Sequence, residues 1–238
     1  MQIEGKRVLI TGASRGLGRA LVTAFVDAGA AEVIAGARKR EDREALNLER
    51  VTPVRLDVTS DRDVEVMSQL DPVDILINNA GVAGFGNPIT MDFAAIQEEV
   101  AVNYLGVLRV TRAVAPGMIA KRDGMIVNVA TAFAKVNLPI VGTYCATKSA
   151  LLSLGQALRA YLSEHGVRVI TVMPTTIDTD MSRGADVPKM TKEFVCAEIL
   201  NAIREESHDP PIGDEAKGVL DTLAKDAIGL EKMLAGVK

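Results

Sequence analysis

Two residues with acid–base chemistry lie four positions apart in the stretch Tyr144-Cys145-Ala146-Thr147-Lys148. In a helix this spacing places both side chains on one face. An isolated phenol has a pKa of about 10, and a nearby ammonium lowers that pKa by favouring the phenolate. The pair could therefore serve as a general acid and base near neutral pH. The spacing alone is weak evidence, because a tyrosine four residues before a lysine often occurs by chance.

A glycine-rich turn near the N-terminus has the composition of a phosphate-binding loop. The stretch Thr11-Gly12-Ala13-Ser14-Arg15-Gly16-Leu17-Gly18 lies between a short apolar run and a helical pattern. Glycines allow a tight turn and a close approach to a ligand, and a helix N-terminus offers free N–H groups to a pyrophosphate. The loop lacks the Gly-Lys-Ser/Thr end of a nucleoside triphosphate loop. A purely structural turn in a ligand-free domain is the alternative.

Arginines near the expected second strand favour NADP(H) over NAD(H). Glu32 lies at the distance from Gly12 where NAD enzymes place an acid, but it opens the strand, whereas ligands lie beyond the carboxyl ends of strands. Ala37 and Arg38 stand at that end. Arg38 could pair with a 2′-phosphate through two charge-assisted hydrogen bonds, and Arg15 could approach the same phosphate from the loop. The alternative is that both arginines are simply solvated.

The elements that must position these residues alternate between strands and helices. Short apolar runs predict strands buried on both faces at about residues 7–10, 33–36, 54–56, 73–77, 125–129 and 167–172. Helical spacing predicts helices or helical segments at 17–28, 38–49, 60–70, 92–119 and 144–165, and a last helix from about 214. This alternation predicts an α/β fold with a doubly wound parallel sheet of the Rossmann type.

Several boundaries of these elements have local signals. Ser60 and Asp92 are expected to cap the starts of their helices, and Gly29 and Gly166 are expected to follow helix ends. Pro116 is expected to kink or end the long helix at 92–119. The stretch Asp209-Pro210-Pro211 is expected to be a turn rather than a strand. Residues 1–238 should form a single NADP-binding domain, with a substrate lid at about 182–210 and a C-terminal helix at 214–238 as its peripheral parts.

Composition excludes several other classes of protein. Hydrophobic residues make up 48% and charged residues 24% of the 238 positions, which is ordinary for a globular chain. The net charge of −4 gives no reason to expect nucleic acid or an anionic membrane as a partner. Two cysteines are too few for a disulfide framework and fit a cytoplasmic protein. His165 and His208 have no neighbouring Cys/His cluster, so no metal site is expected.

An ordered series of motifs extends from Lys6 to Met181. In chain order these are Thr11-Gly12-x-x-x-Gly16-x-Gly18, Asp57, Asn78-Asn79-Ala80-Gly81, Asn103, Asn128, Tyr144-x-x-x-Lys148, Pro174 and Thr179. Because the motifs occur together and in this order, the sequence resembles the short-chain dehydrogenase/reductase family.

The resemblance implies a nicotinamide cofactor and roles for individual residues. Tyr144 would donate a proton to a carbonyl oxygen during reduction, and Lys148 would lower the pKa of the tyrosine and hold the nicotinamide ribose. Asn103 would support a water in a proton relay to Lys148. The residues implied to contact the cofactor are Gly12, Ser14, Arg15, Gly16, Leu17, Gly18, Arg38, Asp57, Val58, Asn79, Ala80, Gly81, Tyr144, Lys148, Pro174, Ile177 and Thr179.

Thr131 departs from the family pattern. It stands thirteen residues before Tyr144, where the family usually has serine. Its hydroxyl can still bond the substrate oxygen, although the extra methyl group stiffens χ1 and occupies pocket volume. We expect Thr131 to be the working replacement and therefore a catalytic residue. A weakened enzyme, or participation of Thr143, is the alternative.

Thr175 is the second departure, because the family usually has glycine after Pro174 at this point. The glycine lies where the chain passes the nicotinamide, so a threonine is expected to reshape this loop. The departure puts in question how closely the roles of Ile177 and Thr179 carry over.

These observations predict an oxidoreductase that reversibly reduces a carbonyl to a secondary or primary alcohol with NADPH. Tyr144 would be its general acid and base, and its substrate would be a small molecule. A 3-oxoacyl-thioester reductase is the alternative among enzymes, although residues 182–195 contain no basic cluster for an acyl carrier protein. A sensor or interaction protein that binds NADP(H) with weak or no catalysis is the alternative of another class.

Two long helices are expected to support self-association. The helices at 92–119 and from Tyr144 resemble the pair through which the family forms dimers and tetramers. The second helix has apolar residues beyond one narrow stripe, namely Leu151, Leu152, Leu154 and Leu158. We therefore expect a homodimer or a homotetramer.

Overall fold

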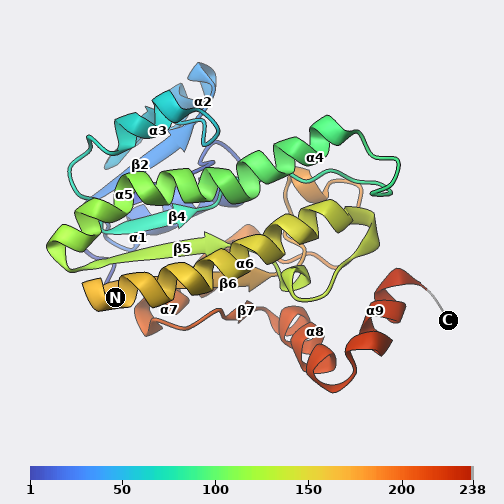
Figure 1. The fold of residues 1–238 in the computed structure, drawn as a ribbon. Helices are drawn as coiled ribbons and strands as arrows, with labels where there is room; N and C mark the ends of the chain where they lie inside the picture. Colours follow the sequence, from blue (N-terminus) through green and yellow to red (C-terminus); the bar gives the residue numbers. More distant parts are fainter. Residues whose placement is uncertain (237–238) are drawn as a thin grey trace.

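Seven parallel strands form one sheet at the centre of the protein, in the order β3-β2-β1-β4-β5-β6-β7 (Figure 1). This computed structural model describes residues 1–236. The strands are β1 (Arg7–Ile10), β2 (Glu32–Ala37), β3 (Val51–Arg55), β4 (Ile75–Asn78), β5 (Gly124–Val129), β6 (Val167–Pro174) and β7 (Pro211–Ile212). The chain winds outward from β1 to β3 and then returns to continue on the other side of β1 through β4. The expected doubly wound α/β fold is confirmed, and its switch point lies between β1 and β4.

Helices cover both faces of this sheet (Figure 1). They are α1 (Gly16–Asp27), α2 (Arg40–Glu44), α3 (Asp61–Met67), α4 (Phe93–Val100), α5 (Val107–Lys121), α6 (Gly142–Leu162), α7 (Lys192–Glu205), α8 (Asp214–Lys225) and α9 (Ala227–Ala235). Helices α1 and α7 pack on one face, whereas α3, α5 and α6 contribute to the core on the other. The short helices α8 and α9 extend from the carboxyl end of the sheet.

The two cores explain why the strands are apolar along their whole length. Val8 and Ile10 point into the core beneath α1 and α7, whereas Leu9 between them points into the core beneath α3 and α5. Neighbouring side chains of a strand face opposite sides of a sheet, so a strand covered on both sides has no polar face. All three residues are fully buried.

The local signals for helix ends are confirmed. The Ser60 hydroxyl accepts a hydrogen bond from the Asp63 N–H at 3.2 Å, and the Asp92 carboxylate accepts one from the Ala94 N–H at 3.1 Å. Gly29 and Gly166 have positive φ angles of 85° and 73°, the left-handed conformation in which helices commonly end.

The long helix expected at 92–119 is more complex. It consists of α4, a π-helical segment η1 (Ala101–Gly106) and α5, and Pro116 lies inside α5 without ending it. A π-helical turn has one extra residue and is often found at functional sites.

The edges of the sheet differ from the sequence-based expectation. Strand β3 begins at Val51 and includes Pro53, and β7 contains Pro211, which was expected to lie in a turn. Both strands are at edges of the sheet. Proline is tolerated there because its missing N–H breaks no ladder hydrogen bond.

The region expected as a lid and one C-terminal helix is also organised differently. Helix α7 occupies 192–205 and packs against α1, with Val195 and Ile199 fully buried, so one face of this part of the expected lid belongs to the core. The last helix divides at Asp226, whose carboxylate caps α9 by accepting a hydrogen bond from the Gly229 N–H. No helix among residues 1–236 is long and apolar enough to span a bilayer.

Candidate active site

The tyrosine–lysine pair lies in the first two turns of helix α6. The Lys148 ammonium lies 5.6 Å from the centre of the Tyr144 ring, and both residues are at the carboxyl end of the sheet. Lys148 is buried, and its Nζ donates a hydrogen bond of 2.8 Å to the carbonyl oxygen of Val129, the last residue of β5. The end of β5 therefore fixes the lysine beside the tyrosine.

Burial dominates the acid–base properties of this pair. It raises the pKa of the Tyr144 phenol, and electrostatic repulsion from Cys145 and Glu99 adds to this effect. Burial also lowers the pKa of the Lys148 ammonium to about 8. The tyrosine pKa therefore moves in the direction opposite to that expected from the sequence, because the lysine charge does not offset the loss of solvent. In this state Tyr144 is a phenol with a proton to donate.

Asn103 joins two parts of the site. It is fully buried in η1, and its Oδ1 accepts a hydrogen bond from the Val82 N–H at 2.9 Å. Its Nδ2 donates to the Val82 carbonyl oxygen at 2.8 Å and to the Thr147 hydroxyl oxygen at 3.0 Å. The Thr147 hydroxyl in turn donates to the Tyr144 carbonyl oxygen at 2.7 Å. The segment after β4 is thus held against the first turn of α6.

Thr131 is the buried residue that precedes a short 3₁₀ helix, η2 (Ala132–Ala134). Its hydroxyl oxygen accepts a hydrogen bond of 3.3 Å from the Phe133 N–H, which leaves the hydroxyl proton available to a substrate oxygen. Thr143 instead donates to the Met91 sulfur at 3.5 Å. This geometry favours Thr131 over Thr143 as the hydroxyl that serves the site.

The glycine-rich loop has the backbone that a phosphate-binding turn needs. Gly12 and Gly16 have φ angles of 65° and 55°. A Cβ atom at Gly18 would lie 2.1 Å from the Gly12 carbonyl oxygen, so only glycine fits there. Arg15 makes no side-chain cap at the start of α1, and the first turn contains no acidic residue. Helix α1 begins with Gly16, Leu17 and Gly18. No negative side chain in this first turn competes for the free N–H groups, so they can bind a pyrophosphate.

The segment after β4 is tied to this loop at the switch point. The Thr11 hydroxyl accepts hydrogen bonds of 3.0 Å from the N–H groups of both Asn79 and Ala80. The Asn79 amide donates to the carbonyl oxygens of Thr11 and Gly12 at 3.0 and 3.2 Å. Gly81 follows beside Lys148, whose Nζ would lie 3.6 Å from a Cβ at that glycine. The structure therefore brings the glycine loop and the tyrosine–lysine pair together.

A basic side chain follows β2, whose end lies beside the glycine loop. Arg38 is exposed just after β2, and neither it nor Arg15 forms an ion pair among residues 1–236. Although partial burial opposes the effect, hydrogen bonds from Thr59 and the charge of Arg38 lower the pKa of the Asp57 carboxyl. Val58 is buried and contacts the helix at Gly106, where a Cβ atom would lie 2.7 Å from its Cγ2.

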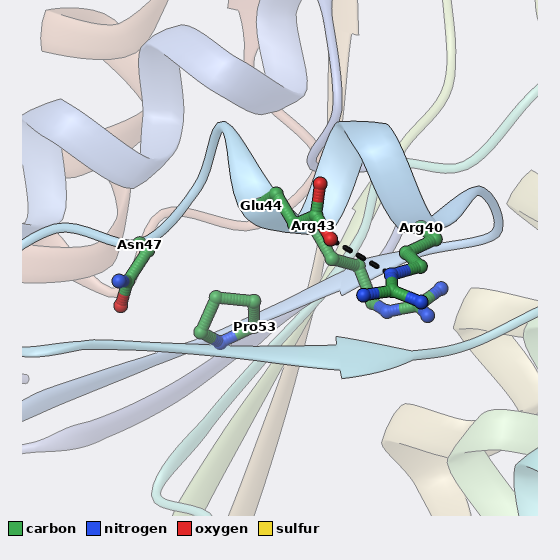
Figure 2. Close-up of a pocket in the computed structure, with 5 residues that line it drawn as sticks. All are labelled: Arg40, Arg43, Glu44, Asn47 and Pro53. Atoms are coloured by element: carbon green, nitrogen blue, oxygen red, sulfur yellow. Dashed lines mark hydrogen bonds and ion pairs between the residues drawn. The ribbon is translucent and has the colours of Figure 1, made fainter.

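A shallow cavity of about 360 Å³ lies near this end, on the outside of α2 and β3 (Figure 2). Arg40, Arg43, Glu44, Asn47 and Pro53 line it, and Arg40 pairs with Glu44 at 2.7 Å. None of the candidate site residues lines this cavity. It is therefore separate from the site described above.

A family model for short chain dehydrogenases matches residues 6–188. The chain belongs to the short-chain dehydrogenase family. Among curated relatives, L-xylulose reductase of Mus musculus is 38% identical over 76% of this chain and 75% of its own length. D-erythrulose reductase of Gallus gallus is 37% identical over 77% of this chain and 76% of its own length. The family expected from the sequence motifs is thus confirmed.

The match to one solved structure extends over almost the whole dehydrogenase. A short chain dehydrogenase of Burkholderia cenocepacia J2315, in complex with NADP, has a TM-score of 0.94 at 36% identity. The match covers 98% of this chain and 99% of that chain. It therefore includes helices α7–α9, which lie beyond the region matched by the family model.

The dehydrogenase's segment after β6 folds back onto the glycine loop. A Cβ atom at Gly16 would lie 3.4 Å from the Thr179 methyl group, which places these distant positions in contact. Ile177 forms a parallel bridge with Met190. Pro174 ends β6, and the next residue, Thr175, donates a hydrogen bond of 2.6 Å to Glu215 on α8.

Two acidic residues that contact segments of the site were not identified from the sequence. Glu99 is 1% exposed, and its Oε1 accepts a hydrogen bond from the Gly84 N–H at 2.6 Å. Its Oε2 is buried and has no partner among residues 1–236. The only available signal was its position one helical turn before Asn103. Glu215 gave no signal, because it is one of three acidic residues in a polar helix.

Proposed function

We propose that this short-chain dehydrogenase is a carbonyl reductase in which Tyr144 is the general acid. The observation that carries the proposal is the half-buried Tyr144 beside the anchored, buried Lys148 ammonium, at the sheet edge that also carries the glycine loop. A bound nicotinamide cofactor supplies the hydride. Tyr144 donates its proton to the substrate oxygen, and Thr131 donates a hydrogen bond to the same oxygen.

Lys148 and Asn103 have supporting roles in this proposal. Lys148 places a positive charge beside the phenol as proton transfer creates negative charge on its oxygen. Asn103 holds Val82 and α6 in a fixed arrangement through its three hydrogen bonds. Neither role requires the pKa of Tyr144 to be low before a cofactor binds.

The cofactor we propose is NADP(H). Arg38 follows β2 at the position expected for the adenosine ribose, and Arg15 lies in the glycine loop. Both side chains can bind the 2′-phosphate without breaking an existing ion pair. The similar Burkholderia protein is in complex with NADP, which supports this choice. The loop fits such a group, since its positive φ angles and the acid-free first turn of α1 favour a pyrophosphate.

Polyhydroxylated ketones are the substrate class that we propose. The names of the curated relatives, L-xylulose reductase and D-erythrulose reductase, support it. The test measures NADPH oxidation with such ketones, with unsubstituted ketones and aldehydes, and with 3-oxoacyl thioesters. Tyr144→Phe should abolish turnover and leave the dissociation constant for NADPH nearly unchanged. Turnover retained by this variant would refute the assignment of the acid, and NADPH binding without any turnover would favour a binding protein.

We also propose that the protein is a cytoplasmic homo-oligomer. Its two cysteines are free and buried, which suits a reducing compartment. Exposed apolar side chains lie before and on α4, including Ile89 and Phe93, which are 88% and 69% exposed. Leu151 and Leu152, expected to contribute to an interface, are instead buried within the chain. Light scattering at low protein concentration distinguishes a monomer from a dimer or tetramer.

A further inference from the structure

Thr175 connects the end of β6 to the C-terminal helices. It is 7% exposed and stands where the family resemblance leads one to expect glycine. Its hydroxyl donates a hydrogen bond of 2.6 Å to Oε2 of Glu215, in the first turn of α8. A hydrogen bond to a carboxylate is stronger and more directional than one between neutral groups. The threonine therefore fixes the direction of the Glu215 carboxylate.

Helix α8 brings Glu215 to the side of the sheet where the candidate active site lies. The helix packs against β7 and against η2, the short helix that begins directly after Thr131. Strand β7 pairs with the end of β6 at Met173 and Pro174. Glu215 thus follows the carboxyl end of β7 and is tied by Thr175 to the end of β6, at the edge of the sheet that carries the candidate site.

The Glu215 carboxylate has unused capacity to bind a ligand. Glu215 is exposed and forms no ion pair in the described part of the chain. The one basic residue near it in α8, Lys217, pairs with Asp214 at 3.5 Å. Only Oε2 is bound, by Thr175, and Oε1 has no hydrogen-bond partner among residues 1–236. An ionised carboxylate accepts hydrogen bonds and donates none, so its complement is a donor group.

The position of Glu215 in the chain also suits a residue that selects the substrate. The family model ends at residue 188, so it includes the glycine loop and the tyrosine–lysine pair but not α8. Chemistry shared by the family therefore resides in the matched part. Differences in substrate are expected to reside in segments beyond it that reach the site.

We propose that Glu215 orients the substrate by accepting hydrogen bonds from the hydroxyl groups of an uncharged polyhydroxylated ketone. This inference rests on the proposed function. It names the residue that recognises the hydroxyl groups of the substrate. Thr175 is a positioning residue, because it acts through the direction it gives to the carboxylate. The same negative charge disfavours anionic substrates, which include acyl thioesters that carry a phosphate.

The test compares two ketones with the same four-carbon skeleton. Erythrulose carries three hydroxyl groups, whereas 2-butanone carries none. In Glu215→Gln the KM for erythrulose should rise about tenfold, which is the loss expected for one charge-assisted hydrogen bond of about 1.4 kcal/mol. The kcat/KM for 2-butanone and the dissociation constant for NADPH should stay within about twofold, since neither ligand uses the carboxylate. Equal losses for both ketones, or no loss for either, would overturn the proposal.

Two further variants separate recognition from structure. Asp221→Asn removes the same charge from an exposed position of α8 that makes no side-chain hydrogen bond, and it should leave both ketones unaffected. Thr175→Val removes the hydroxyl and keeps the side-chain shape, and it should raise the KM for erythrulose without changing that for 2-butanone. If Asp221→Asn changes the KM for erythrulose as much as Glu215→Gln does, the effect is one of general charge and the proposal fails.

A binding measurement distinguishes this inference from the proposed function. Saturation-transfer NMR on the NADP⁺ complex detects threitol, a product of erythrulose reduction, without turnover. Threitol contact in the wild type that Glu215→Gln weakens supports the role of Glu215 even if no ketone is reduced, in which case only the proposed function fails. A wild-type complex that shows no contact with threitol overturns the role of Glu215.

Discussion

The hydrogen bonds of Asn103 allow the effect of one substitution to be worked out. Asn103→Ala leaves the N–H and carbonyl groups of the half-buried Val82 without their partners on the fully buried Asn103, at bond lengths of 2.9 and 2.8 Å. Each unpaired buried group costs about 1–3 kcal/mol, so we expect a loss of about 2–4 kcal/mol after partial relaxation. For a domain of this size that corresponds to a fall in melting temperature of about 4–16 °C.

The assay is thermal unfolding followed by fluorescence, together with NADPH turnover. A matched control is Asn137→Ala, which removes an exposed hydrogen bond of 3.1 Å to the Gly142 carbonyl oxygen. This control should lower the melting temperature by less than about 3 °C. If Asn103→Ala destabilises the protein no more than Asn137→Ala does, Asn103 does not fix the segment after β4, and the reasoning is refuted.

A second variant predicts how the stability of the protein changes with pH. In Asn103→Asp one oxygen can still accept from Val82, but the other faces the Val82 carbonyl and can bond it only as a protonated carboxyl. The folded-state pKa of this aspartate should therefore be raised above its unfolded value. The stability contributed by the protonated aspartate is then fully present below its unfolded pKa and is lost as the pH rises through its folded pKa. The melting temperature relative to wild type should fall with rising pH, and a rise would contradict the assignment.

Three more substitutions test other parts of the site. Arg38→Gln should weaken NADPH binding about tenfold or more and leave NADH binding unchanged, by fluorescence titration; equal losses would exclude a contact with the 2′-phosphate. Glu99→Gln removes a charge that raises the pKa of Tyr144, so the pH profile of alcohol oxidation, which needs the phenolate, should shift to lower pH; a shift upward would contradict this. Gly18→Ala should strongly destabilise the protein, because its Cβ would overlap the Gly12 carbonyl, whereas Gly218→Ala in open space should not, and similar melting temperatures would refute the steric argument.

The sequence predicted the parts of the fold that depend on neighbouring residues. Six of the seven strands, the helix caps at Ser60 and Asp92 and the glycine ends at Gly29 and Gly166 were all predicted, because each signal lies within a few residues. Strand β7 was missed, since two residues have no periodicity. The packing of α7 against α1 within the predicted lid at 182–210 was not foreseen, because an amphipathic face does not reveal which element will cover it.

The sequence by itself determined the family and the order of the motifs, because chemistry at the site depends on residue types at fixed positions along the chain. Tertiary structure decided which of these residues meet. It raised the pKa of Tyr144 rather than lowering it, since desolvation depends on everything packed around the phenol. It also joined Thr175 to Glu215 across forty positions, a contact that no local pattern encodes. Such contacts arise only when separate elements pack onto the same edge of the sheet.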